Sequence, residues 1–243
     1  MSHYLKDKTL VVIGGSSGIG LRVAQQAADI GAQLIIVGRN VERLEAARAE
    51  LAACGAAVQI YQVDAHDHAA LQTLFTDLPN FDHLVSMVGD VNSGGFLVNE
   101  IASIRHVIES KFLTNVRIGQ LAATKIREGG SLIFTSGTGG RAQDACGSYV
   151  GNLGLNALVE GLAVELAPKV RVNAVSPTWT VTPFWRDVPA ERVASIKQHF
   201  EQVIPLKRTA SIDELASAYL FLITNGFITG QNIAVDGGVM LGA

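Results

Sequence analysis

A tyrosine and a serine in the second half of the chain could together handle a proton. Ser136 ends an apolar run, and Tyr149 follows thirteen residues later, where a helical pattern begins. A phenol transfers a proton at neutral pH most readily when a nearby cation lowers its pKa. With a glycine-rich loop near the N-terminus, the pair suggests hydride chemistry. The turn after Tyr149 holds Gly151, Asn152 and Leu153 but no cation. Either another element supplies the charge, or this site has changed its chemistry.

The glycine-rich loop reads GGSSGIG and lies between an apolar run and a helical pattern. Its glycines follow GxxxGxG spacing, which allows a tight turn and close approach of the backbone to a phosphate. The N-terminus of the following helix then faces the pyrophosphate. Two serines add hydroxyl donors. We therefore expect a dinucleotide site formed by Gly14, Ser16, Ser17, Gly18, Ile19 and Gly20.

The ends of the second and third apolar runs indicate which dinucleotide binds. The second run ends in Gly38 and Arg39, where sites that prefer NAD often place a carboxylate. A guanidinium suits a 2′-phosphate instead, although a solvated surface arginine is the alternative. Asp64 ends the third run and Ala65 follows it. A carboxylate at this place can accept a hydrogen bond from the adenine amine or begin the next helix. The sequence favours NADP(H) over NAD(H).

Short apolar runs alternate with helical patterns along the whole chain. Nearly continuous apolar runs are typical of strands buried on both faces of a parallel sheet. The pattern predicts an α/β fold with a doubly wound parallel sheet, helices on both faces, and a single domain over residues 1–243. The expected strands are 9–14, 33–38, 57–64, 83–89, 131–136, 170–177 and 231–236, and the expected helices lie near 18–30, 41–53, 67–77, 100–127, 149–167, 186–201 and 211–224.

The composition excludes several classes of protein. The chain is 48% apolar with a net charge of −3 and scattered basic residues, so we expect no nucleic-acid partner. Cys54 and Cys146 form no CxxC pair, which fits a reducing compartment. No apolar run has the length of a signal peptide or a membrane span, so we expect a soluble cytoplasmic protein with no membrane partner. The two histidines of DAHDH (64–68) are better explained by a solvated loop than by a metal site.

End to end, the chain resembles the short-chain dehydrogenase/reductase family. The matching stretches are GGSSGIG, RVNAVSP (171–177), TVTP (180–183) and ITGQNIAVDGG (228–238). The resemblance implies a Rossmann-type seven-stranded sheet, a nicotinamide cofactor, a small-molecule carbonyl or alcohol substrate, and a homodimer or homotetramer. It also implies a mobile substrate loop over about 178–202. The positions that it places near the nicotinamide end are Gly89, Pro177, Thr180 and Thr182, and its strand-end serine matches Ser136.

The chain departs from the family at the Tyr-x-x-x-Lys pair. Counting four residues on from Tyr149 gives Leu153. Counting back from ELAP (165–168) in the family register places the tyrosine at Ser148 and the lysine at Asn152. Neither register supplies a lysine. The two registers differ by one residue, which is about 100° around a helix.

A lysine in the preceding helical pattern is a candidate for the missing cation. Lys111 lies within an apolar stripe made of Ile101, Ile104, Val107, Ile108, Phe112 and Ile118, where an unpaired ammonium is costly. The family alignment places an active-site asparagine at this position. We hypothesise that Lys111 binds the nicotinamide ribose and lowers the pKa of Tyr149, while Ser136 holds the substrate oxygen and Asn152 orients a water or touches the ribose. The alternative is a lysine that reaches water or pairs with a carboxylate.

These residues favour an NADPH-dependent carbonyl reductase or alcohol dehydrogenase with a non-standard Ser-Tyr-Lys set. The missing lysine leaves two alternatives open: a cofactor-binding protein of the same fold without redox activity, acting as a regulatory or structural partner, and a non-redox lyase or isomerase. Trp179, Phe184 and Trp185 predict either an apolar substrate pocket or packing of the loop onto the sheet or a neighbouring subunit.

Overall fold

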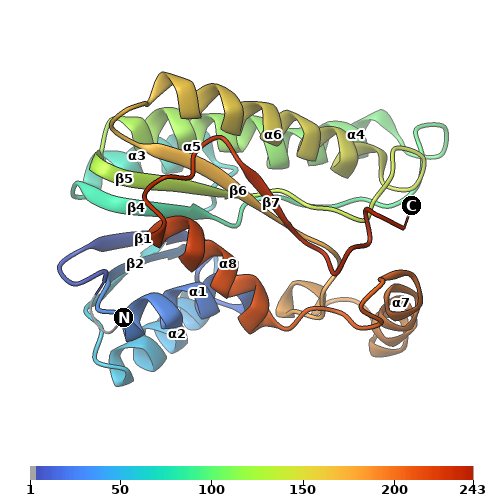
Figure 1. The fold of residues 1–243 in the computed structure, drawn as a ribbon, viewed down its shortest axis with the longest axis horizontal. Coiled ribbons are helices and arrows are strands. Elements are labelled where there is room, and N and C mark those ends of the chain that lie inside the picture. Colours follow the sequence, from blue (N-terminus) through green and yellow to red (C-terminus); the bar gives the residue numbers. More distant parts are fainter. Residues whose placement is uncertain (1–3, 243) are drawn as a thin grey trace.

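The computed structural model describes residues 4–242 and contains one parallel sheet of seven strands. The strand order is β3-β2-β1-β4-β5-β6-β7 (Figure 1). The chain adds β2 and β3 on one side of β1 and then β4 to β7 on the other side, as in a doubly wound Rossmann-type fold. Every neighbouring pair is parallel, so the predicted fold class is confirmed. The strands are β1 (Thr9–Ile13), β2 (Gln33–Gly38), β3 (Val58–Gln62), β4 (Phe81–Ser86), β5 (Ile126–Thr135), β6 (Arg171–Pro177) and β7 (Asn232–Val235).

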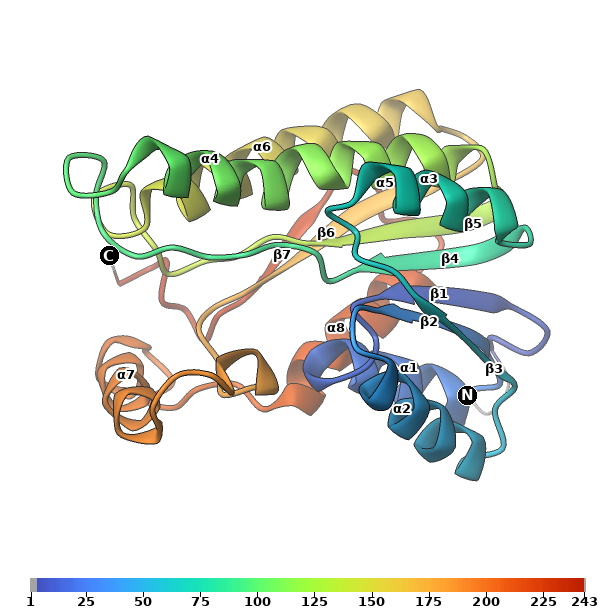
Figure 2. The ribbon, with the colours of Figure 1, turned by 180° about the vertical axis from the view of Figure 1, so that it is seen from behind.

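Helices cover both faces of the sheet (Figures 1 and 2). One face carries α1 (Gly18–Asp29), α2 (Val41–Ala53) and α8 (Ile212–Thr224), and the other carries α3 (His68–Asp77), α4 (Ile101–Ile108), α5 (Thr114–Ala123) and α6 (Cys146–Glu165). The helix α7 (Ala190–Val203) lies beyond the carboxyl ends of the strands, away from the sheet. None of the helices in residues 4–242 has the length and apolar character needed to cross a membrane.

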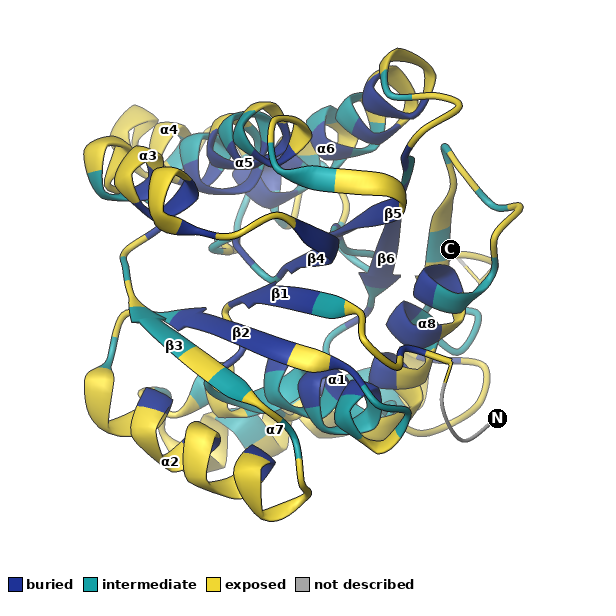
Figure 3. Cartoon of the chain, turned by 90° about the vertical axis from the view of Figure 1, so that its left-hand side faces the viewer, coloured by how far each residue is buried: buried dark blue, intermediate teal, exposed yellow. Residues whose placement is uncertain are grey.

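The strands are apolar because both of their faces are covered. In β1, Val11 and Ile13 belong to the core under α5 and α6, whereas Leu10 and Val12 belong to the core under α1 and α8. Burial fades at the edge of the sheet, where β3 is only partly covered (Figure 3). The continuous apolar runs of the sequence therefore correspond to the central strands.

Two predicted helix boundaries are wrong at the place where the chemistry was expected. The helix predicted over 100–127 is α4, then a π-helical turn η1 (Glu109–Leu113), then α5, and β5 already begins at Ile126. Ile126 pairs with Phe81 of β4. A residue that the helical pattern of the sequence assigned to a helix is therefore part of the sheet. The helix predicted from Tyr149 begins three residues earlier, at Cys146. Tyr149 thus lies inside the helix rather than at its start.

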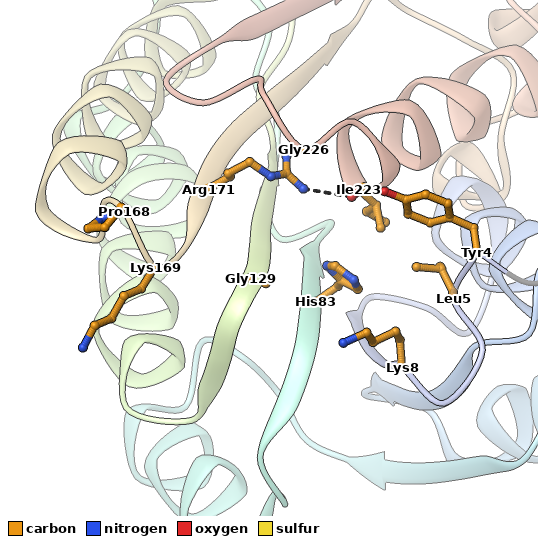
Figure 4. A pocket seen from close by; sticks show the side chains of 11 residues that line it. Tyr4, Leu5, Lys8, His83, Gly129, Pro168, Lys169, Arg171, Ile223 and Gly226 are labelled. Atoms are coloured by element: carbon orange, nitrogen blue, oxygen red, sulfur yellow. Dashed lines mark hydrogen bonds between the residues drawn. The ribbon is translucent and has the colours of Figure 1, made fainter.

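A cavity of about 330 Å³ lies at the amino ends of the strands, opposite the edge where ligands are expected (Figure 4). Two basic side chains that line this cavity, Lys8 and Arg171, are already bound to other groups of the protein. Lys8 pairs with Asp82 at 3.0 Å, and Arg171 donates hydrogen bonds to the carbonyls of Leu222 and Ile223 at 2.7 and 2.8 Å. We therefore treat this cavity as structural.

The buried His83 in this cavity predicts acid sensitivity of the fold. Burial lowers the pKa of His83 to about 4, an effect that Asp82 partly opposes. In the unfolded chain His83 becomes protonated below pH 6.5, whereas in the folded chain it becomes protonated only below about pH 4. The free energy of unfolding should therefore fall by about 3 kcal/mol from this group between pH 6.5 and 4. Denaturant unfolding at both pH values should show a smaller fall in His83→Asn; an equal fall in both proteins would contradict the assignment.

Candidate active site

The glycine-rich loop forms a cradle between β1 and α1 at the carboxyl edge of the sheet. Gly14 and Gly18 have φ of +87° and +59°, a left-handed conformation that side chains disfavour. A Cβ at Gly20 would collide with the carbonyl oxygen of Gly14, so α1 begins tightly against the loop. The first turn of α1 has no acidic residue, which leaves its positive end available to an anion. The cradle fits a pyrophosphate group.

The segment after β6 covers this loop. Ser17 is the N-cap residue of α1, yet its side chain makes no capping bond and instead accepts a hydrogen bond from Arg186 Nη2 at 3.1 Å. A Cβ at Gly18 would lie 3.4 Å from Pro183 Cδ. Arg186 therefore brings a cation to the expected phosphate site. The helix predicted near 186–201 would have begun at Arg186, but α7 begins at Ala190 and Arg186 instead ends the short helix η2.

The adenine end is formed by the carboxyl ends of β2 and β3. Ser16 lies against Gly38, because a Cβ at Gly38 would be 3.0 Å from Ser16 Oγ. Arg39 is exposed beside them. Burial tends to raise the pKa of Asp64, but hydrogen bonds from His66 and the charge of Arg39 outweigh it and lower that pKa. Asp67, not Asp64, caps α3, so the helix-starting alternative for Asp64 is wrong.

The side chain of Lys111 extends between two glycines into the carboxyl end of the sheet. A Cβ at Gly89, in the loop after β4, would lie 3.0 Å from Lys111 Cγ and 3.4 Å from its Nζ. A Cβ at Gly151 of α6 would lie 2.9 Å from Lys111 Cβ and 3.2 Å from its Cδ. Lys111 is only 6% exposed. The turn of α6 after Tyr149 has no lysine of its own. Its Gly151 leaves the space that the side chain of Lys111 occupies.

The π-helical turn is anchored to β4 by a buried amide. Asn115 Nδ2 donates hydrogen bonds to the carbonyls of Val88 and Lys111 at 3.0 and 2.7 Å, and its Oδ1 accepts one from Ser86 at 2.7 Å. A π turn inserts one residue into a helix and is frequent at functional sites. The predicted apolar stripe is wrong at Ile101, which is 72% exposed, because the buried positions are those nearest this turn.

The ammonium of Lys111 is buried and has no directly bound counter-charge within residues 4–242. Burial lowers the pKa of Lys111 to about 8, and the charge of Asp90 opposes that shift. Among the residues that the structure describes, no carboxylate lies within ion-pairing distance of Lys111 and no hydrogen bond is made by its Nζ. The ion-pair alternative therefore finds no support. At neutral pH most of the population still carries the proton.

Ser136 faces a row of polar side chains on α6. Its Oγ donates a hydrogen bond to Asn156 Oδ1 at 2.9 Å. Asn152 Nδ2 donates to the carbonyl of Gly137 at 3.2 Å, while Asn152 Oδ1 is buried without a partner. Tyr149 lies three and seven residues before these asparagines, so it occupies the same face of α6. Asn156 was missed because nothing in the helical pattern distinguishes it.

The competing tyrosine register places Ser148 in the site, but Ser148 is committed elsewhere. It is buried, its backbone N–H donates to Asn92 Oδ1 at 3.0 Å, and its Oγ accepts from the Asn92 N–H at 2.8 Å. The hydroxyl of Tyr149 has no hydrogen-bond partner among the described residues. Of the two residues, Tyr149 is the one with a free hydroxyl.

The residues after β6 form an aromatic segment next to the cleft. Trp179 packs against Trp185 and Phe200 with ring centroids 5.8 and 5.6 Å apart. Trp185 Nε1 donates a hydrogen bond to the carbonyl of Thr180 at 3.0 Å. The two tryptophans thus pack against each other and against α7, an arrangement that neither sequence-based alternative specified. Pro177 ends β6, Thr180 is buried, and Thr182 caps the short helix η2 (Pro183–Trp185).

Comparison with known proteins decides the family. A family model described as Enoyl-(Acyl carrier protein) reductase matches residues 13–240. The 3-oxoacyl-(acyl-carrier-protein) reductase of Mus musculus is 33% identical over 254 residues, which cover 97% of this chain and 99% of the mouse protein. The chain belongs to the short-chain dehydrogenase/reductase family. It is therefore a member of a family of oxidoreductases that use a nicotinamide cofactor.

Solved structures of short-chain dehydrogenases agree with this assignment. A short-chain dehydrogenase/reductase from Serratia marcescens has a TM-score of 0.88 at 25% identity, covering 98% of this chain and 99% of that one. A small-chain dehydrogenase in complex with NADPH has a TM-score of 0.80 at 27% identity, covering 96% and 99% of the two chains. The short-chain dehydrogenase/reductase fold is thus present over nearly the whole chain.

The glycine that makes room for Lys111 predicts a specific loss in this family member. In Gly151→Ala the new methyl group would displace Lys111, because the nearest atoms lie 2.9 Å away. We expect kcat/KM to fall on the order of 100-fold, which a misplacement of about 1 Å in an active site can cost.

The matched control is Gly161→Ala on the same helix, where the nearest atom lies 3.9 Å away. Alanine should stabilise either helical position by about 0.5–1 kcal/mol when there is room. Steady-state kinetics and thermal unfolding of both variants test this, and equal activity would show that Lys111 does not depend on the gap at Gly151.

Proposed function

We propose that this chain is an NADP(H)-dependent carbonyl reductase or alcohol dehydrogenase whose cation comes from Lys111 rather than from α6. The observation that carries the proposal is the buried Lys111 side chain in the gap between Gly89 and Gly151. A buried, unpaired ammonium in the cleft of an α/β sheet is costly unless it serves the site.

Each polar side chain of the cleft has a role in this proposal. Bound nicotinamide would supply or accept the hydride. Tyr149 gives a proton to the substrate oxygen during reduction, and the charge of Lys111 stabilises the resulting phenolate. Ser136 holds the same oxygen after its hydroxyl leaves Asn156, to which it donates at 2.9 Å. The unpartnered Oδ1 of Asn152 accepts a hydrogen bond from water or from the ribose.

The preference for NADP(H) is part of the proposal. It is supported by the exposed Arg39, which follows Gly38. A carboxylate side chain at position 38 would have no room unless Ser16 moved, because a Cβ there would lie 3.0 Å from Ser16 Oγ. A guanidinium in this place suits a 2′-phosphate.

Removing this guanidinium should weaken the use of NADPH selectively. We expect Arg39→Ala to lower kcat/KM for NADPH roughly 10- to 100-fold, which corresponds to one lost charged hydrogen bond, and to leave the value for NADH unchanged. Arg43→Ala, an exposed arginine in the first turn of α2, is the control. Equal losses with both cofactors would remove Arg39 from specificity.

The surroundings of the cleft complete the proposed function. We assign residues 178–202 as the substrate loop, with 1–243 as one domain. The groove of about 390 Å³ between α5 and α6, lined by Phe112, Val116 and Leu158, supports a homodimer or homotetramer. Leu162 of α6 also lines this groove, whereas Leu155 of the same helix is buried in the monomer core. We propose a cytoplasmic location.

A panel of carbonyl compounds with NADPH tests the proposed function. Oxidation of NADPH by at least one class of carbonyl, followed by absorbance, supports a reductase. Tight NADPH binding without turnover on any compound would instead favour a cofactor-binding protein of the same fold. Conversion of a compound without any change in NADPH absorbance would favour a lyase or isomerase.

A further inference from the structure

Two histidines, two carboxylates and a serine of the π-helical turn form a connected cluster. His106 Nε2 lies 2.9 Å from Asp90 Oδ2, and His66 Nδ1 lies 3.0 Å from Asp64 Oδ1. His66 Nε2 is 2.8 Å from Ser110 Oγ, which also accepts the backbone N–H of Asp90 at 2.8 Å. The rings of His66 and His106 stack with centroids 6.3 Å apart. We call these five residues the Asp90 cluster.

Two members of the cluster are next in the chain to residues around Lys111 or to Lys111 itself. Asp90 directly follows Gly89, against which the Lys111 side chain packs, and Ser110 directly precedes Lys111 in the π turn. The bond between Ser110 and the Asp90 backbone therefore fixes the loop after β4 to the turn that carries the lysine. Ser110 is fully buried, so this link is inside the protein.

We propose that Asp90 is a positioning residue that holds the positive charge of Lys111 in the cleft, with His106 and Ser110 fixing its carboxylate and backbone. The consequence for catalysis rests on the proposed function, but the effect on Lys111 itself does not. Asp90 acts through space, because it makes no ion pair with Lys111 within the described part of the chain.

Electrostatics select Asp90 from the other charged groups near the turn. Burial lowers the pKa of Lys111 and the charge of Asp90 opposes that effect. Glu109 is in the same π turn, yet its carboxylate pairs with His68 and Arg117 at 3.6 and 3.5 Å. The remaining titratable groups on the elements around this turn are His66, His106 and Asp64 of the cluster, Arg105 on α4, and Cys146, Tyr149, Glu160 and Glu165 on α6.

The test measures the charge of Lys111 directly. The protein is labelled with ¹³C-lysine, and the Cε signal that is lost in Lys111→Met is titrated between pH 6 and 11 without cofactor. Asp90→Asn, an isosteric change, should move the midpoint of this signal to lower pH. Glu109→Gln removes the same charge two residues from Lys111 and should leave the midpoint in place. Asp90→Ser serves as a second neutral variant in case the amide disturbs the loop.

The kinetic readout is the alkaline limb of the pH–rate profile with NADPH, which should move with the midpoint in Asp90→Asn and stay in Glu109→Gln. An unchanged midpoint in both Asp90 variants would overturn the proposal, as would equal shifts in the Asp90 and Glu109 variants. A midpoint that moves as expected in a protein that turns over no carbonyl supports the role of Asp90 and refutes the proposed function instead.

Discussion

Replacing Lys111 by methionine should lower kcat at least about 100-fold, which is the lower range of what positioned acid–base groups contribute. The linear methionine side chain fills the gap between Gly89 and Gly151 but carries no charge, so the proposed proton donor Tyr149 loses the cation that would stabilise its phenolate. Because burial already disfavours the ammonium, the free energy of unfolding should stay the same or increase. Much of the NADPH affinity should remain, since the phosphate loop is untouched.

Lys169→Met is a suitable control, because Lys169 is an exposed lysine at the opposite end of the sheet. Steady-state rates, NADPH titration and thermal unfolding of both variants separate a chemical loss from a folding defect. Full activity in Lys111→Met would remove Lys111 from the mechanism.

Replacing Tyr149 by phenylalanine should have an effect of similar size, about 100-fold or more on kcat, because it removes the proposed proton donor. The hydroxyl has no hydrogen-bond partner among the described residues, so the stability of the protein should be unaffected. Ser148→Ala, the other register, should retain activity. It should lose about 1 kcal/mol of stability, because the hydroxyl that bonds Asn92 is gone.

This pair of variants distinguishes the two registers of α6. A loss of turnover in Ser148→Ala with normal rates in Tyr149→Phe would mean that Ser148, the residue found by counting back from ELAP, is in the site. Tyr149 would then not be the proton donor. Rates are compared at saturating NADPH, and circular dichroism shows whether each variant is folded.

The central sheet could be predicted from the sequence because burial on both faces makes a strand continuously apolar, as in β1 and β2. The burial of Lys111 could also be predicted from the helical period of its neighbours. The π turn could not, because it depends on a tertiary contact: Asn115 bonds both the carbonyl of Lys111 and that of Val88 beside β4. The exposure of Ile101 could not be predicted either, because the periodicity of a helix does not show where along its length the helix stops contacting the core.

Several groups of the site had no local signal. Asp90 and Arg186 lie in irregular segments, and their partners His106 and Ser17 are 16 and 169 residues away in the chain. Gly151 looked like part of a missing motif, and only the packing of Lys111 against it shows why a small residue stands there. Side chains that act across the cleft are identified by contacts between elements, which spacing along one helix does not reveal.

A crystal structure with NADP⁺ tests the central claim most directly, because it locates Lys111 and Tyr149 relative to the nicotinamide. Our account predicts that Lys111 Nζ lies about 3 Å from a hydroxyl of the nicotinamide ribose, with the Tyr149 hydroxyl on the side of the ring from which hydride would leave. A Lys111 side chain turned away toward Asp90, or a Tyr149 ring directed out of the cleft, would contradict it.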